Sequence, residues 1–118
     1  MVMTTPHPAR RILITGADGF LGRTVVAALA QLPDIDSVVA LDVREVPAVR
    51  RAPGVTYVAQ DIRAPELRAT LAQHSIDAVV HLAAIVTPGG DSNREFEYSV
   101  DVLGTRNVLE ACIACNVG

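Results

Sequence analysis

The sequence of 118 residues predicts an α/β fold in which helices cover both faces of a parallel sheet. Short apolar runs without polar alternation recur along the chain, and segments with helical periodicity separate them. A glycine-rich turn joins the first apolar run to the first helical segment. Groups able to bind a ligand follow each of the runs, whose carboxyl ends meet at one edge of a parallel sheet. Together these observations predict a doubly wound sheet with strand order 3-2-1-4.

The first strand and the first helix are expected directly after a short leader. Residues 1–10 contain two prolines and no apolar core, so we expect a flexible leader and no signal peptide. The apolar run at 11–15 predicts a strand, and helical periodicity predicts a helix over 20–32 that ends before Pro33. The expected buried face of this helix consists of Leu21, Val25, Ala28, Leu29 and Leu32.

The middle of the chain is expected to contribute two strands and a helix. The run at 37–41 has no polar alternation, which is typical of a strand covered on both faces. Residues 43–54 hold two prolines and three arginines and predict a loop with at most one helical turn. A third strand is expected at 55–59. A helix is expected from Pro65 to about residue 74, because proline favours the first helical turn.

The last part of the chain predicts one more strand and a long helix. The strand is expected at 78–81, before a loop rich in proline and glycine. Ser92 and Glu95 have capping-box spacing, which predicts a helix from near residue 94 to about residue 115. The chain stops where a fifth strand would begin, so we interpret 11–118 as one domain that is incomplete at its carboxyl end.

Composition argues against several classes of function. The formal net charge is −3 and all ten basic residues are arginine, so no basic surface for nucleic acid is expected. The longest uncharged run, 78–90, is shorter than the roughly 20 residues that cross a bilayer. Cys112 and Cys115 lie too close together in a predicted helix to join separate elements, which indicates a reducing cytoplasm. Without a second ligand pair they predict no metal site.

The stretch from Thr15 to Gly22 carries the strongest functional signal. It joins the first strand to the first helix, whose N-terminus has unpaired N–H groups and about half a positive charge. Gly16 suits a tight turn, Gly19 a close approach of a pyrophosphate, and Gly22 the packing of the helix near the strand. The spacing therefore predicts a nucleotide site, and purely structural glycines are the alternative.

Asp42 favours a dinucleotide. It lies twenty residues after Gly22 at the end of the second predicted strand, where a carboxylate can accept hydrogen bonds from a ribose diol. An ATP-binding phosphate loop would need glycine at position 17 and lysine at position 23, and the chain has Ala17 and Arg23. These two residues argue against nucleotide hydrolysis of that kind.

Three motifs in order resemble a known family. They are Thr15-Gly16-x-x-Gly19-x-x-Gly22, His81-Leu82-Ala83-Ala84 and Gly104-Thr105-x-Asn107-Val108-Leu109-Glu110-Ala111. The family that they resemble is the extended short-chain dehydrogenase/reductases, also called NAD-dependent epimerase/dehydratases. The resemblance covers nearly the whole chain and implies a Rossmann-type sheet, of which strands from the fifth onward are missing here.

The resemblance also implies which residues hold the cofactor. The pyrophosphate would be bound, largely through backbone, by Gly16, Gly19, Phe20, Leu21 and Gly22. Asp42 would bind the adenosine ribose, Asp61 and Ile62 would flank the adenine, and Leu82, Ala83 and Ala84 would line the cofactor further along. NAD is expected because the Asp42 carboxylate repels the extra phosphate of NADP. Arg44 is the group that would receive that phosphate if NADP were bound.

Two departures from the family's pattern bear on activity. The usual asparagine three residues before the Gly-Thr pair is Asp101 here, and a carboxylate cannot donate a hydrogen bond as an amide does. The family's catalytic Tyr-x-x-x-Lys pair is missing, since the chain has no lysine. We expect the cofactor-binding part of a longer oxidoreductase or epimerase that moves hydride to or from a secondary alcohol carbon, inactive alone. A dinucleotide-sensing member without catalysis is the alternative.

The remaining features are assigned to packing and assembly. His81 is expected to pack and hydrogen-bond around the fourth strand. The last helix carries two apolar stripes, of which one can face the sheet and the other a second subunit. The stripes are Phe96, Val100, Leu103 and Ala111, and Val102, Leu109 and Ile113. The resemblance implies a homodimer through this helix and a small-molecule substrate that the sequence does not identify.

Overall fold

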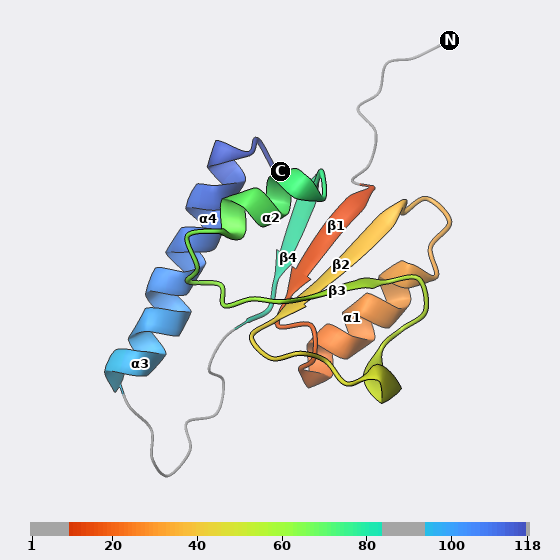
Figure 1. Ribbon diagram of the computed structural model, residues 1–118, viewed down its shortest axis with the longest axis horizontal. Coiled ribbons are helices and arrows are strands. Elements are labelled where there is room, and N and C mark those ends of the chain that lie inside the picture. Colours follow the sequence, from red (N-terminus) through yellow and green to blue (C-terminus); the bar gives the residue numbers. More distant parts are fainter. Residues whose placement is uncertain (1–9, 84–93, 118) are drawn as a thin grey trace.

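The computed structural model describes residues 10–83 and 94–117, which contain a four-stranded sheet flanked by helices (Figure 1). The strands are β1 (Arg11–Thr15), β2 (Ser37–Asp42), β3 (Thr56–Ala59) and β4 (Ala78–His81). Their spatial order is β3-β2-β1-β4, and each neighbouring pair is parallel. The predicted α/β class and the predicted strand order are confirmed.

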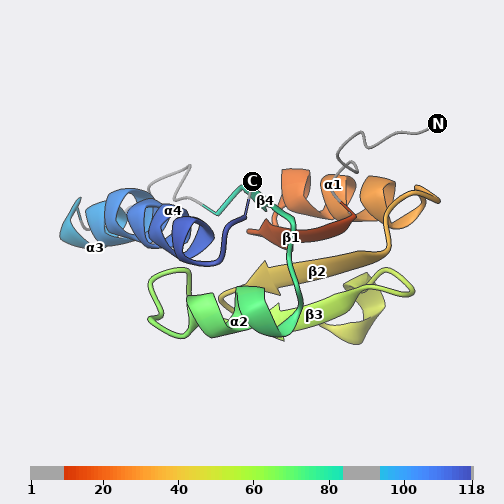
Figure 2. The same ribbon diagram turned by 90° about the horizontal axis from the view of Figure 1, so that it is seen from above.

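The helices lie on both faces of the sheet. They are α1 (Phe20–Ala30), the short 3-10 turn η1 (Ala48–Arg50), α2 (Leu67–Gln73), α3 (Arg94–Tyr98), the π-helical segment η2 (Ser99–Gly104) and α4 (Thr105–Ala114). Figure 2 shows α1 on one side of the sheet and α2 on the opposite side, and α4 packs with α2. The turn η1 is the single helical turn expected in the arginine-rich loop.

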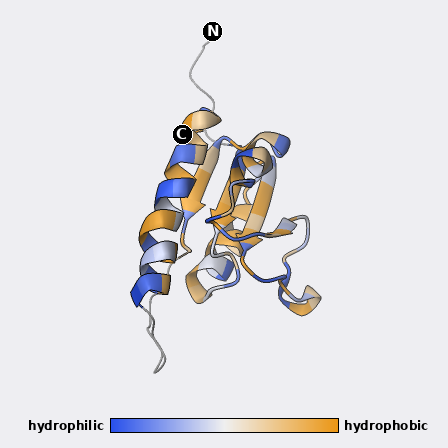
Figure 3. Ribbon diagram, turned by 60° about the vertical axis from the view of Figure 1, so that its left-hand side comes forward, coloured by the Kyte–Doolittle hydropathy of each residue, from blue (hydrophilic) through white to orange (hydrophobic). Residues whose placement is uncertain are grey.

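Alternate residues of the central strands supply two apolar cores. Ile12 and Ile14 of β1 pack with Val26 of α1 on one face. Leu13 of β1 packs on the other face with Leu67 of α2 and with the apolar side of α4. The strands are hydrophobic nearly throughout, whereas α4 has both apolar and polar positions (Figure 3). This double burial explains why the apolar runs have no polar alternation.

The structure corrects two helix boundaries. Helix α1 ends at Ala30. Of the face predicted to be buried, Leu21, Ala28 and Leu32 are exposed, Val25 and Leu29 are half-buried, and the buried side chain of this helix is Val26. Helix α2 begins at Leu67, so Pro65 does not lie in its first turn. The N–H of Leu67 donates to the carbonyl of Ala64 over 3.2 Å, which places the proline in a turn before the helix. That turn extends the connection at the carboxyl end of β3.

The last predicted helix is present from Arg94 to Ala114 but changes its winding. Its π-helical segment contains Gly104, which is buried against Ile62: an added Cβ would lie 2.6 Å from Ile62 Cδ1. Leu103, predicted on the same stripe as Val100, is 45% exposed. The expected leader at 1–9 and the expected cap at Ser92 lie outside the described residues.

Candidate functional site

A cavity of about 640 Å³ lies where the carboxyl ends of the four strands meet. Its wall comes from the glycine turn after β1, the end of β2, the segments after β3 and β4, and Phe96 and Val100 from the last helix. The predicted site residues that line it are Gly16, Gly19, Phe20, Leu21, Gly22, Asp42, Asp61, Ile62, Leu82 and Ala83. Arg44 is exposed and does not line this cavity, and Ala84 lies outside the described residues.

Two of the three glycines are required by the protein's own packing. Gly16 has φ of +67°, and an added Cβ would lie 2.8 Å from the backbone nitrogen of Ala83. Gly22 lies in the first turn of helix α1, so close to the glycine turn that an added Cβ would lie 2.1 Å from the Gly16 carbonyl oxygen. Only glycine therefore allows β1, α1 and the segment after β4 to converge at this point.

Gly19 is different, because the protein itself leaves room for a side chain there. Its φ is −72°, and the nearest atom to an added Cβ is the Gly16 carbonyl oxygen at 3.4 Å. The residue lies at the N-terminus of α1 and lines the cavity. Glycine at this position keeps open a space beside unpaired helical N–H groups, which is the arrangement that suits a phosphate oxygen.

Asp42 is held in place by the turn. Its Oδ2 accepts a hydrogen bond from the backbone N–H of Asp18 over 2.9 Å, and Asp42 lines the cavity at the end of β2. Within the described residues, Oδ1 of Asp42 has no hydrogen-bond partner. This oxygen is therefore available to accept from a ligand hydroxyl.

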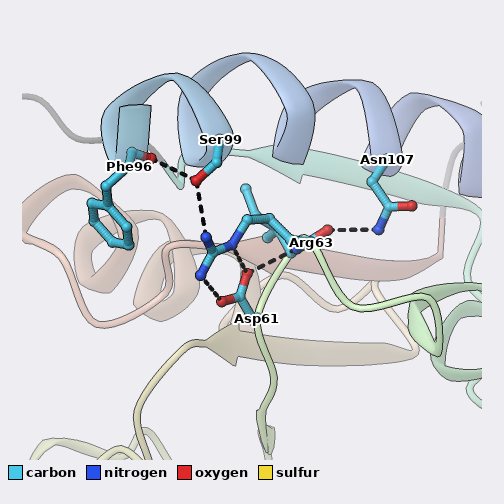
Figure 4. A network of polar contacts seen from close by, with 6 residues as sticks. Asp61, Arg63, Phe96, Ser99 and Asn107 are labelled. Carbon is cyan, nitrogen blue, oxygen red and sulfur yellow. Dashed lines mark hydrogen bonds and ion pairs between the residues drawn. The ribbon is translucent and has the colours of Figure 1, made fainter. Parts of the chain in front are cut away.

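Asp61 forms an ion pair that the sequence did not reveal. Arg63 donates to it through Nε over 3.0 Å and through Nη2 over 2.6 Å, and also through its backbone N–H over 2.8 Å (Figure 4). The guanidinium donates to Ser99 Oγ over 2.9 Å and lies 5.3 Å from the centre of the Phe96 ring. The Arg63 side chain lowers the pKa of Asp61. Arg63 thus fixes a carboxylate of the cavity wall and connects it to the last helix.

Comparison with known proteins identifies the family. The sequence model of the 3-beta hydroxysteroid dehydrogenase/isomerase family matches residues 13–118. The chain belongs to this family. The predicted membership of the NAD-dependent epimerase/dehydratases, the extended short-chain dehydrogenase/reductases, is thereby confirmed.

Two curated relatives cover most of the chain. D-Erythronate dehydrogenase of Haemophilus influenzae is 33% identical over 104 residues, which are 86% of this chain and 33% of that protein. L-Arabinose 1-dehydrogenase (NAD(P)(+)) of Haloferax volcanii is 36% identical over 107 residues, 91% of this chain and 37% of that protein. The chain therefore spans about a third of the length of these relatives.

A solved structure agrees with the fold. UDP-glucose 4-epimerase of Thermus thermophilus, solved as a complex with NAD, superposes with a TM-score of 0.79 at 27% identity. The match covers 91% of this chain and 35% of the epimerase chain, in its N-terminal part. The four strands thus have the arrangement found at the start of this family's sheet.

The family's third motif ties the last helix to the cavity wall. Asn107 Nδ2 donates to the carbonyl oxygen of Ile62 over 2.7 Å (Figure 4). It also donates to the carbonyl oxygen of Ala64 over 2.9 Å. These carbonyls belong to the turn after β3, where a strand no longer supplies donors. The motif was recognised in the sequence, but this contact spans 45 residues and no local pattern indicates it.

The family's second motif contributes a partly buried chain of hydrogen bonds. Thr15 Oγ1 accepts from the N–H groups of Leu82 and Ala83 over 2.9 and 3.1 Å, so its own proton points to His81 Nδ1 at 2.7 Å. His81 Nε2 then carries the proton that faces Thr105 Oγ1 at 2.8 Å. Burial lowers the pKa of His81, which favours this neutral form. The predicted packing role of His81 is confirmed.

The two cysteines also have a packing role. Both are free and half-buried, and Cys115 Sγ contacts the carbonyl oxygen of Arg68 at 3.4 Å. Burial raises the pKa of Cys112. Residues 10–83 and 94–117 contain no group of three side chains that could hold a metal ion. None of their helices is long and apolar enough to cross a membrane.

Proposed function

We propose that this chain is the NAD-binding part of an NAD-dependent dehydrogenase or epimerase. The observation that carries the proposal is the open position at Gly19, where the cavity reaches the N-terminus of α1. The packing of the protein itself does not require glycine there. A pyrophosphate would occupy that space and accept hydrogen bonds from the turn. The NAD complex of the Thermus thermophilus epimerase, which shares this fold, supports the assignment.

The other cavity residues have roles that follow from their positions. The available Oδ1 of Asp42 would accept from the adenosine ribose diol, and a carboxylate there favours NAD over NADP. Asp61 and Ile62 would flank the adenine, while Leu82 and Ala83 would lie beside the cofactor further along the cavity. Arg44 is exposed and lies outside this cavity, so its position gives no support to binding of NADP.

A bound nicotinamide cofactor would accept or supply the hydride at a secondary alcohol carbon. The residues of this chain would bind the cofactor, orient it and exclude water from the apolar part of the cavity. A proton-transfer pair of the Tyr-x-x-x-Lys type would have to come from sequence beyond Gly118, since these 118 residues contain no lysine. An uninterrupted reading frame beyond Gly118 that lacks this pair would favour the dinucleotide-sensing alternative. The two free cysteines suit a cytoplasmic protein.

Titration calorimetry tests the cofactor assignment. NAD is expected to bind the folded chain, and Gly19→Val is expected to weaken binding at least tenfold because its side chain would fill the phosphate space. Ala28→Val is the matched control, since it adds a branched residue to an exposed position of the same helix. Equal affinity of Gly19→Val and Ala28→Val, with both variants folded by circular dichroism, would refute the proposed site.

We also propose a homodimer through the last helix. Val102, Leu109 and Ile113 form an apolar stripe and are 46%, 59% and 78% exposed. Exposed apolar surface of this kind is typical of an interface. Light scattering should report a mass near twice that of the chain, and Leu109→Glu should lower it to that of a monomer. A wild-type chain that stays monomeric at high concentration would contradict this proposal.

A further inference from the structure

An ion pair connects the glycine turn to the loop after β2. Arg50 Nε donates to Asp18 Oδ1 over 2.9 Å, and Arg50 Nη2 donates to Asp18 Oδ2 over 2.6 Å. Paired contacts of this kind are the strongest that a guanidinium makes with a carboxylate. The hydrogen bonds from Arg50 lower the pKa of Asp18, so its carboxylate is charged at neutral pH. Neither partner of this pair lines the large cavity.

The same aspartate also holds the carboxylate assigned to the ribose. The backbone N–H of Asp18 donates to Asp42 Oδ2 over 2.9 Å, so a single residue links Arg50 to Asp42. The adenosine 2′-hydroxyl would bind at Asp42 under the proposed function. Two carboxylates therefore lie at this corner of the site, and the guanidinium connected to them is already neutralised.

Arg50 is one of three arginines that lie in this region. Arg51 donates to the carbonyl oxygen of Val46 over 2.7 Å and lies 5.2 Å from the centre of the Tyr57 ring. Arg23, Arg50 and Arg51 line a second cavity of about 250 Å³, and Asp18 also belongs to its wall. Arg50 thus lines this second cavity, and its partner Asp18 is the residue whose backbone N–H donates to Asp42.

We propose that Asp18 is a specificity-determining residue, which makes the site reject a dinucleotide with a 2′-phosphate by keeping Arg50 neutralised. The inference rests on the proposed function, because it requires the ribose to bind at Asp42. A 2′-phosphate placed at this corner would meet the charges of Asp42 and Asp18, and the Arg50 donors would already be used. Without the Asp18 charge, Arg50 becomes a phosphate ligand.

The test compares the dissociation constants of NAD and NADP by titration calorimetry at low salt. Asp18→Asn keeps the size of the side chain and its backbone N–H but removes the charge. The ratio of the NADP constant to the NAD constant is expected to fall at least about tenfold. A charge-assisted hydrogen bond to a phosphate corresponds to a factor of this size or more. In the double variant Asp18→Asn/Arg50→Gln the ratio is expected to return most of the way towards the wild-type value.

A control separates this effect from a change of net charge. Glu45→Gln removes one negative charge from the same loop, where Glu45 Oε1 lies 3.5 Å from Arg51 Nη2. It is expected to leave the ratio within about twofold of the wild-type value, because exposed pairs contribute little. A merely structural role of Asp18 would change the affinity for both dinucleotides by the same factor and leave the ratio constant.

The outcomes distinguish this inference from the function on which it rests. NAD binding with an unchanged ratio in Asp18→Asn would overturn the inference and leave the cofactor site standing. A fall in the ratio that persists in the double variant, or that Glu45→Gln reproduces, would also overturn the inference. A wild-type chain that is folded and binds neither dinucleotide would overturn the proposed function and this inference together.

Discussion

Gly22→Ala is expected to destabilise the chain by about 2 kcal/mol. The added methyl group would lie 2.1 Å from the Gly16 carbonyl oxygen and 2.9 Å from the backbone of Ala17, where ordinary contact begins at 3.4 Å. A methyl group has no rotamer that avoids backbone atoms, so helix α1 must shift by more than 1 Å. Overpacking of this kind costs about 1–3 kcal/mol, and we take the upper value. The better helix propensity of alanine offsets about 1 kcal/mol of it.

Urea unfolding followed by far-ultraviolet circular dichroism measures this loss, which corresponds to a fall in melting temperature of about 8 °C. Gly19→Ala is the matched control, because the same methyl group at the same end of α1 has its nearest neighbour at 3.4 Å. That variant is expected to lose less than about 1 kcal/mol. If Gly22→Ala is as stable as the wild type, helix α1 does not contact the turn as described.

Two further predictions concern the polar contacts that hold the site. The pKa of His81 is lowered by burial, so below about pH 6.5 the unfolded chain binds a proton that the folded chain does not. The unfolding free energy should therefore fall as the pH falls from 6.5 to 5.5, and this pH dependence should be weaker in His81→Gln. Equal pH dependence in the wild type and the variant would contradict the conclusion that burial keeps His81 neutral. Asn107→Ala leaves the carbonyls of Ile62 and Ala64 without their donor and should cost about 1–3 kcal/mol in urea unfolding, whereas no loss would mean that water replaces the amide.

The sequence was sufficient to predict the sheet, because its evidence is local. Each strand is a short apolar run separated from the next by a helical segment, and order 3-2-1-4 is that of a doubly wound dinucleotide-binding sheet, so it could be predicted before any contact was known. Helix ends were less certain, since they depend on tertiary contacts. Pro65 has the features of a helix start, yet a turn at Asp61–Ala64 delays α2 until Leu67. The π-helical winding at Ser99–Gly104 has no marker in the sequence that we could identify.

Side-chain contacts across the fold could not be predicted. The predicted cavity residues are mostly backbone ligands or strand ends, whose places follow from topology alone. The groups that hold them in place come from distant segments: Arg50 on Asp18, Arg63 on Asp61, and Asn107 on the turn after β3. No local sequence pattern indicates which distant residue an arginine or an asparagine will contact. The same reason explains why Arg44, two residues after Asp42, was predicted at a cavity that it does not line.

Contacts within the chain fix the shape of the glycine turn, and this bears on the affinity expected for a dinucleotide. The N–H of Ala17 donates to the Leu41 carbonyl over 3.1 Å, and that of Asp18 donates to Asp42 over 2.9 Å. Gly16 packs against the segment after β4 from the other side. Contacts from the ends of β2 and β4 therefore restrict the turn, so a pyrophosphate bound there as proposed would meet aligned donors and little ordering entropy would be lost. The close packing at Gly16 and Gly22 creates this rigidity, and Gly19 leaves the space in which a phosphate would bind under the proposed function.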